Sequence, residues 1–169
     1  MNKSKYSVGK VSRRADLLML FMCITGLMLA GMIGSLLGGS AVEYDTGIRP
    51  LFAVPSLFLT AMWNAAFTIL GISLSGVYKF RPTTDKETKR KFISLILFAS
   101  QLAFVTTWGL IFFRLNIPLL AFVWAAIIFI LSVAYMISVL PYAKPAGWVI
   151  IPYLVFLSYI AYISIMFVL

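Results

Sequence analysis

The sequence predicts an all-α integral membrane protein, a bundle of five transmembrane helices, and two observations support this prediction. First, 62% of the 169 residues are apolar and only 11% are charged, and the mean hydropathy is +1.01, values far outside the range of soluble domains. Second, the apolar residues gather in five runs, each close to the length of about 20 residues that a helix needs to cross the hydrocarbon core. A lipid bilayer is therefore the expected environment.

We expect the spans to be helices because backbone amides cannot stay unpaired in lipid, and the runs lack the short alternating pattern of barrel strands. The connections are short, so residues 17–169 are expected to form one transmembrane domain after a basic tail, residues 1–16. The five predicted spans are Leu17–Gly38, Leu57–Val77, Phe92–Phe113, Leu119–Leu140 and Trp148–Leu169.

The first span follows the basic tail as a secretory signal would, but it is longer than the roughly 7 to 15 apolar residues of a signal peptide. Gly26, Ala30, Gly34 and Gly38 recur in it at four-residue spacing. This spacing places small residues on one face, which favours close packing against another helix. That helix could belong to the same chain or to a second copy, so a homodimer is one of the two outcomes.

The basic residues predict the orientation. Twelve of the fourteen Lys and Arg residues lie in the tail, in residues 78–91 and in residues 141–147, whereas only Arg49 and Arg114 lie in the other loops. Because short cytoplasmic loops carry an excess of Lys and Arg, we expect the N-terminus in the cytoplasm, with the chain in a bacterial cytoplasmic membrane. The net charge of +9 is then expected to meet anionic lipid headgroups rather than nucleic acid.

Much of catalytic chemistry is missing from the spans. The chain has no histidine, which excludes a Ser-His-Asp nucleophile and a histidine ligand for haem iron or zinc. Without intramembrane carboxylates, the usual proton relays of pumps are also absent. We therefore expect no enzyme, no metal site and no required cofactor. The carboxylates all lie outside the predicted spans, at Asp16, Glu43, Asp45, Asp85 and Glu87.

Aromatic and amide side chains are the chemistry that remains inside the spans, for example Trp63, Gln101 and Trp108. Such a set can line an apolar ligand pocket with a few orienting hydrogen bonds. Aromatic residues also pack helices together and anchor span ends at the lipid interface in every membrane protein. Composition alone leaves both interpretations open.

Four segments stand out by their order and spacing. Tyr44–Ser56 reads YDTGIRPLFAVPS, and the span that follows carries Trp63 and Phe67. Gln101–Phe113 reads QLAFVTTWGLIFF, and Pro152–Ser164 reads PYLVFLSYIAYIS. Together these segments resemble the TspO/MBR family, also called translocator proteins, tryptophan-rich sensory proteins or peripheral benzodiazepine receptors.

The resemblance implies a five-helix membrane fold and a membrane sensor or carrier that binds porphyrins such as protoporphyrin IX or haem, or other flat apolar ligands, and regulates tetrapyrrole or stress responses. The loop between the first two spans would form a lid, and the helices behind it would line a pocket. By this resemblance the ligand-binding residues are Tyr44, Pro50, Phe52, Trp63, Phe67, Gln101, Trp108, Tyr153 and Phe156.

The sequence also departs from the family pattern at three positions. Phe156 stands where the family usually has Trp, Val105 where it has Asn, and Ser164 where it has Asn late in the last span. Each lost N–H removes one orienting hydrogen bond, about 1 kcal/mol net. Some bacterial members degrade porphyrin in light, and the replacement of indole by phenyl at Phe156 argues against that activity here.

Two other classes of function stay open. The chain could be a small channel or transporter subunit whose helices assemble around a path, although the lack of intramembrane charge argues against coupled transport. It could also be a purely structural membrane subunit, in which case the aromatic residues only pack helices.

Overall fold

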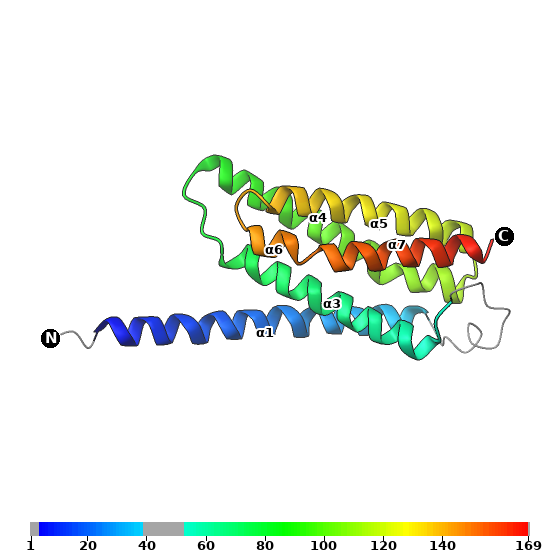
Figure 1. Cartoon of the computed structure of the whole chain (residues 1–169), viewed down its shortest axis with the longest axis horizontal. Helices are drawn as coiled ribbons and strands as arrows, with labels where there is room; N and C mark the ends of the chain where they lie inside the picture. The colour runs from blue at the N-terminus through cyan, green and yellow to red at the C-terminus, as the bar shows by residue number, and fades with distance from the viewer. Residues whose placement is uncertain (1–3, 39–52, 169) are drawn as a thin grey trace.

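The structure is a computed structural model that describes residues 4–38 and 53–168, and these residues form helices and no strands. Five helical segments are long and apolar enough to cross a membrane, which confirms the predicted fold class (Figure 1). The elements are α1 Ser4–Gly38, α3 Ser56–Lys79, α4 Asp85–Gly109, the π-helical turn η1 Leu110–Arg114, α5 Pro118–Val139, α6 Lys144–Trp148 and α7 Ile151–Met166.

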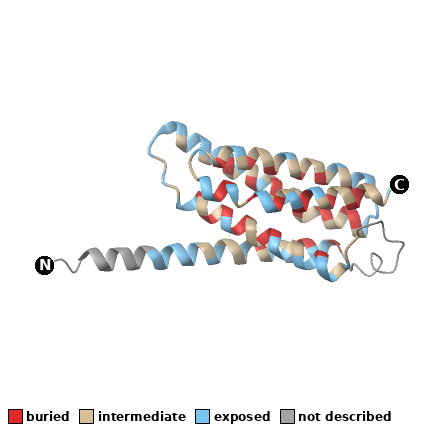
Figure 2. Cartoon of the chain, in the orientation of Figure 1, coloured by how far each residue is buried: buried red, intermediate tan, exposed pale blue. Residues whose placement is uncertain are grey.

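The five segments close into a ring. α1 packs on both α3 and α4, α4 packs on α5, α5 packs on α7, and α7 returns to α3. The largest fully buried side chains, among them Trp108, Tyr135 and Tyr153, lie inside this ring. Figure 2 shows the buried residues along the inner faces of α3, α4, α5 and α7, whereas α1 is mostly exposed or intermediate. α1 is therefore the peripheral helix of the bundle.

Two segments differ from the predicted spans. α1 begins at Ser4, so the helix continues from the first span back through most of the basic tail. The last span was predicted as one helix from Trp148, but Trp148 ends α6, and α7 begins at Ile151 after a short turn. Proline explains this break, because Pro152 has no N–H to continue a helix from α6 and instead occupies the first turn of α7.

Capping fixes the connection between α3 and α4. The Thr84 hydroxyl accepts from the Glu87 N–H at 3.3 Å, while the Glu87 carboxylate accepts from the N–H groups of Thr83 and Thr84, a capping box that starts α4. Lys91 donates from Nζ to the Phe80 carbonyl at 2.7 Å, so it satisfies an acceptor just beyond the C-terminus of α3. The basic residues of this connection therefore sit on an ordered turn.

The N-terminus of α1, the α3–α4 connection and the turn before α6 lie at one end of the bundle, and the end of α1, the start of α3 and the C-terminus lie at the other (Figure 1). The three basic stretches of the sequence consequently share one end, which we call the basic end. The side of the membrane that it faces stays a prediction.

α1 approaches α4 at the distance of backbone contact. A Cβ atom added at Gly34 would lie 2.8 Å from the Thr106 carbonyl oxygen, and one at Gly38 would lie 3.0 Å from the Gly109 carbonyl carbon. A Cβ at Gly26, by contrast, would meet nothing within 4 Å. Gly34 and Gly38 of the small-residue stripe thus pack against a helix of the same chain. The sequence alone had left open whether that helix belongs to the same chain or to a second copy.

Replacing Gly34 with alanine should destabilise the bundle. The obstructing atom is a backbone carbonyl that cannot rotate away, so α1 and α4 must separate, and we expect a loss of about 1–3 kcal/mol in the free energy of unfolding, as for overpacked cores. Unfolding by SDS in mixed micelles, followed by circular dichroism, measures this. Gly26→Ala on the same helix is the control and should leave the stability nearly unchanged. Equal stability of the two variants would contradict the close contact.

Candidate ligand-binding site

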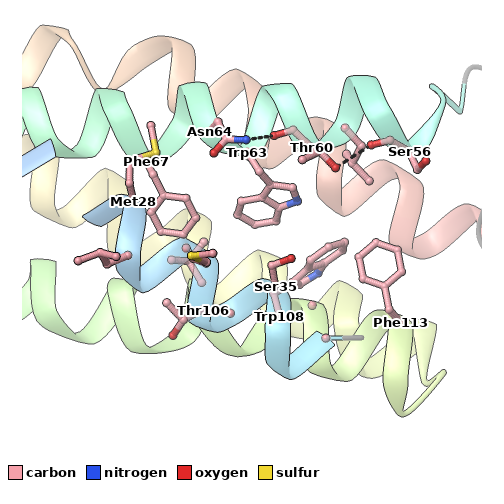
Figure 3. A pocket seen from close by; sticks show the side chains of 18 of the residues that line it. Met28, Ser35, Ser56, Thr60, Trp63, Asn64, Phe67, Thr106, Trp108 and Phe113 are labelled. Carbon is pink, nitrogen blue, oxygen red and sulfur yellow. Dashed lines mark hydrogen bonds between the residues drawn. The ribbon is translucent and has the colours of Figure 1, made fainter. Parts of the chain in front are cut away.

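A cavity of ≈ 830 Å³ lies between α1, α3 and α4 (Figure 3), and its lining residues belong to the half of the bundle away from the basic end. Ligand pockets for small molecules have volumes of about 300–1,000 Å³, so the cavity is large enough for a multi-ring ligand. Among the described residues, its lining comprises Thr25, Met28, Leu29, Gly31, Met32, Gly34, Ser35, Gly38, Ser56, Leu59, Thr60, Trp63, Asn64, Phe67, Val105, Thr106, Trp108, Gly109 and Phe113.

Aromatic rings form one wall of this cavity, and Trp63 is at their centre. Its ring lies 5.5 Å from that of Trp108, 6.0 Å from that of Phe67 and 5.0 Å from that of Phe156, measured between centroids. The contact with Phe156 is edge to face, a favourable arrangement for aromatic pairs. Trp63 is therefore held in place from behind while it points into the cavity (Figure 3).

The π-helical turn η1 shapes the far end of the same wall. The Leu115 N–H donates to the Leu110 carbonyl, five residues back, at 2.9 Å, which is the π-type pattern. This turn carries Phe112, whose ring stacks on Trp108 at 4.8 Å, and Phe113, which lines the cavity. Such turns frequently occur at functional sites.

The two cavity tryptophans differ in their N–H groups. Trp108 is fully buried and donates from Nε1 to the Ala121 carbonyl at 3.2 Å, so only its ring is available to a ligand. No described residue accepts a hydrogen bond from Nε1 of Trp63. Since a Trp N–H in an apolar site normally finds a partner, Trp63 can donate to a bound molecule.

The described part of the lining contains hydroxyl and amide groups but no charged residue. Most of the hydroxyls donate to carbonyls of their own helices, as Thr60 does to Ser56 and Thr106 does to Leu102. The described residues also contain no group of His, Cys, Asp and Glu that could hold a metal ion. The cavity is thus suited to dispersion and stacking contacts with a few orienting hydrogen bonds.

The structure divides the predicted site residues into three groups. Trp63, Phe67 and Trp108 line the cavity together, and Phe156 contacts Trp63 from behind. Gln101 and Tyr153 are fully buried in the core and are absent from the cavity lining. The lid residues lie outside the described residues, namely Tyr44, Pro50 and Phe52.

Gln101 belongs to a buried polar contact between α4 and α5. Its Oε1 accepts from the Ser132 hydroxyl at 2.7 Å, and the same hydroxyl lies 2.7 Å from the Ile128 carbonyl. Its Nε2 has no partner among the described residues. Buried polar groups in a membrane bundle commonly join helices in this way, so the structure gives Gln101 a role in packing.

The sequence reasoning missed the contribution of α1. Met28, Met32 and Ser35 form the third side of the cavity. Gly31 allows α1 to lie against the Phe67 ring, because a Cβ at this position would lie 2.6 Å from that ring. The small-residue stripe indicated a close helix contact and could have suggested a thin wall. No pattern in the sequence distinguished these methionines from residues that face lipid.

Comparison with known proteins agrees with the geometry. The pattern of the TspO/MBR family matches residues 18–169, about nine-tenths of the chain. The chain belongs to the TspO/MBR family. One relative, the tryptophan-rich protein TspO of Chlorobaculum tepidum, is 26% identical over 151 residues, which cover 88% of this chain and 93% of the relative. Membership in the TspO/MBR family supports, in general terms, a membrane sensor or binding protein.

Two of the three departures from the TspO/MBR pattern, Val105 and Phe156, lie at the cavity or directly behind its wall. Val105 lines the cavity and supplies no hydrogen bond where the family usually has Asn. Phe156 packs its ring on Trp63, and Ser164 donates to the Ile160 carbonyl of its own helix. The wall of this TspO/MBR protein therefore offers fewer donors than the usual pattern, and the Trp63 N–H gains importance.

Replacing Ser132 with alanine should lower stability. The change leaves both polar atoms of the Gln101 amide unpaired in the core, which costs about 1–3 kcal/mol. SDS unfolding followed by circular dichroism measures the loss. Ser158→Ala is the matched control, because Ser158 also donates to the carbonyl four residues back but is exposed. Equal stability of the two variants would show that the Gln101 contact contributes nothing.

Proposed function

We propose that this TspO/MBR protein is a membrane sensor or carrier that holds a porphyrin-type or other flat apolar ligand between α1, α3 and α4. The observation that carries this proposal is the pair of rings of Trp63 and Trp108, 5.5 Å apart, on the wall of a ≈ 830 Å³ cavity whose described lining is uncharged. A flat ring system gains dispersion and offset stacking against such faces, about 0.5–1.5 kcal/mol per aromatic pair beyond area burial.

Binding rather than catalysis fits the residues. The described lining offers no acidic or basic side chain, and general acid–base catalysis needs a titratable group beside the reacting atoms. Haem would bind without an axial histidine, since the sequence has none, and its ring faces would stack on the aromatic wall. In the proposed role, occupancy of the cavity is itself the signal or the cargo.

Titration with protoporphyrin IX tests the proposal. The purified chain should shift the Soret absorption band of the porphyrin saturably, with a defined Kd. Trp63→Leu removes one ring face and should raise the Kd by about 2- to 12-fold, the loss expected for one aromatic pair. Trp63→Phe keeps an aromatic face and should lose less.

Trp148→Leu is the control for this titration, because Trp148 is exposed and lies outside the cavity lining. Its Kd should match that of the unaltered chain. A porphyrin that does not bind saturably, or that binds with the same Kd in all four proteins, would refute the cavity as the site.

We also propose that the basic end faces the cytoplasm, as the distribution of Lys and Arg favours. In a chain whose native Cys23 is replaced by serine, a cysteine at Leu115, which is exposed at the opposite end, should react with an impermeant maleimide on intact cells. A cysteine at Thr83, on the basic end, should react only after permeabilisation. The reverse pattern would invert the orientation.

A further inference from the structure

A line of polar residues runs along α3 beside the cavity. Ser56, Thr60, Asn64 and Thr68 recur at four-residue intervals, which places them on one face of the helix. Thr60 and Asn64 are exposed although they lie in a membrane-spanning segment. Polar side chains in such segments generally face a bundle interior, a partner helix or a cavity, so this exposed line requires an explanation.

The polar side chains of this line donate hydrogen bonds along α3, but the hydrogen-bonding groups of the Asn64 amide are only partly used. Thr60 donates to the Ser56 carbonyl, Asn64 donates from Nδ2 to the Thr60 carbonyl, and Thr68 donates to the Asn64 carbonyl, each at 2.9 Å. The side-chain oxygen of Asn64 and its second N–H have no partner among the described residues. Asn64 thus keeps one acceptor and one donor for a molecule beside it.

Across the cavity from this line of polar residues, the lining residues belong to α1. Leu29 and Met32 line the cavity, and their side chains are 61% and 62% exposed. Thr60 and Asn64 of α3 also line the cavity and are also exposed. Residues that line a cavity and are exposed at the same time lie at its mouth. In Figure 3, Thr60 and Asn64 lie along α3 at the edge of the space into which Trp63 points.

The mouth lies within the hydrophobic length of the bundle. Leu29 and Met32 fall inside the Arg13–Gly38 span, and Asn64 falls inside the Ser56–Lys79 span. From these positions we expect hydrocarbon rather than water around the mouth. A molecule that enters here must already be dissolved in the bilayer.

We infer that the cavity opens sideways to the membrane interior between α1 and α3, and that it admits the uncharged part of an amphiphile, which hydrogen-bonds to Asn64 through a polar group. The inference rests on the proposed function and adds to it the ligand class and the entrance. No charged side chain of the described lining would balance an ionised group, and moving a bare charge through hydrocarbon is costly. An alcohol, amide or ester on a large apolar body fits these walls.

Lipid-borne quenching tests the opening. Variants that keep only one tryptophan, at Trp63 or Trp148, are placed in vesicles of phosphatidylcholine with brominated acyl chains. The Trp63 fluorescence should be quenched nearly as strongly as that of exposed Trp148. Quenching of Trp63 that is much weaker than that of Trp148, whether protein or a second copy shields it, would overturn the inference.

A plug at the mouth provides the second measurement. Thr60→Phe in the Trp63-only chain should reduce the quenching by brominated lipid, because the larger ring fills the entrance. Thr68→Phe is the matched control: this threonine lies two turns further along the same line of polar residues and is absent from the cavity lining. Equal quenching in the two variants would contradict an entrance at Thr60.

The polar contact is tested with protoporphyrin IX dimethyl ester, an uncharged probe. Asn64→Leu should weaken its binding by about 2- to 12-fold, the loss expected for one hydrogen bond, and Thr68→Val should not. Unchanged affinity in Asn64→Leu would overturn the assigned role of Asn64. If no porphyrin binds at all, the proposed function fails, whereas strong porphyrin binding with unquenched Trp63 overturns only the sideways entrance.

Discussion

The contact between α1 and α4 at Gly34 and Gly38 is the constraint on which the rest of the site depends. In lipid, helices gain little from burying apolar side chains, so close backbone packing is what brings them together. Because neither glycine has a side chain, α1 rests directly on the backbone at Thr106 and Gly109. This contact places α1 opposite the N-terminal half of α3 and so leaves the cavity between them.

Three features could be predicted from the sequence because each follows from composition over long segments. They are the membrane environment, the five membrane-spanning helices and the position of the basic stretches at one end of the bundle. The length of an apolar run fixes a crossing, and the alternation of loops then fixes which stretches lie together. The resemblance to the family in turn singled out Trp63, Phe67 and Trp108 as candidate site residues, and in the structure their rings lie close together. These predictions needed no knowledge of side-chain packing.

Other features could not be predicted because they depend on how one helix meets the next. Whether Gln101 reaches the cavity or the core depends on the rotation of α4, and the structure turns it toward Ser132. Met32 looks like any lipid-facing residue until the position of α1 is known. The break between α6 and α7 is carried by Pro152, yet a proline inside an apolar run is also compatible with a kinked continuous helix.

The ring closure through α7 sets an order of assembly. α1 and α3 are neighbours along the chain and can pair as soon as both have left the ribosome and entered the membrane, whereas the Phe156 ring that covers one side of Trp63 belongs to the last span. Until the last span is made, this indole lacks the Phe156 ring as its neighbour. The surroundings of the central side chain of the site are thus completed only with the last span, and a chain truncated before α7 would keep the helices that line the cavity without the ring behind Trp63.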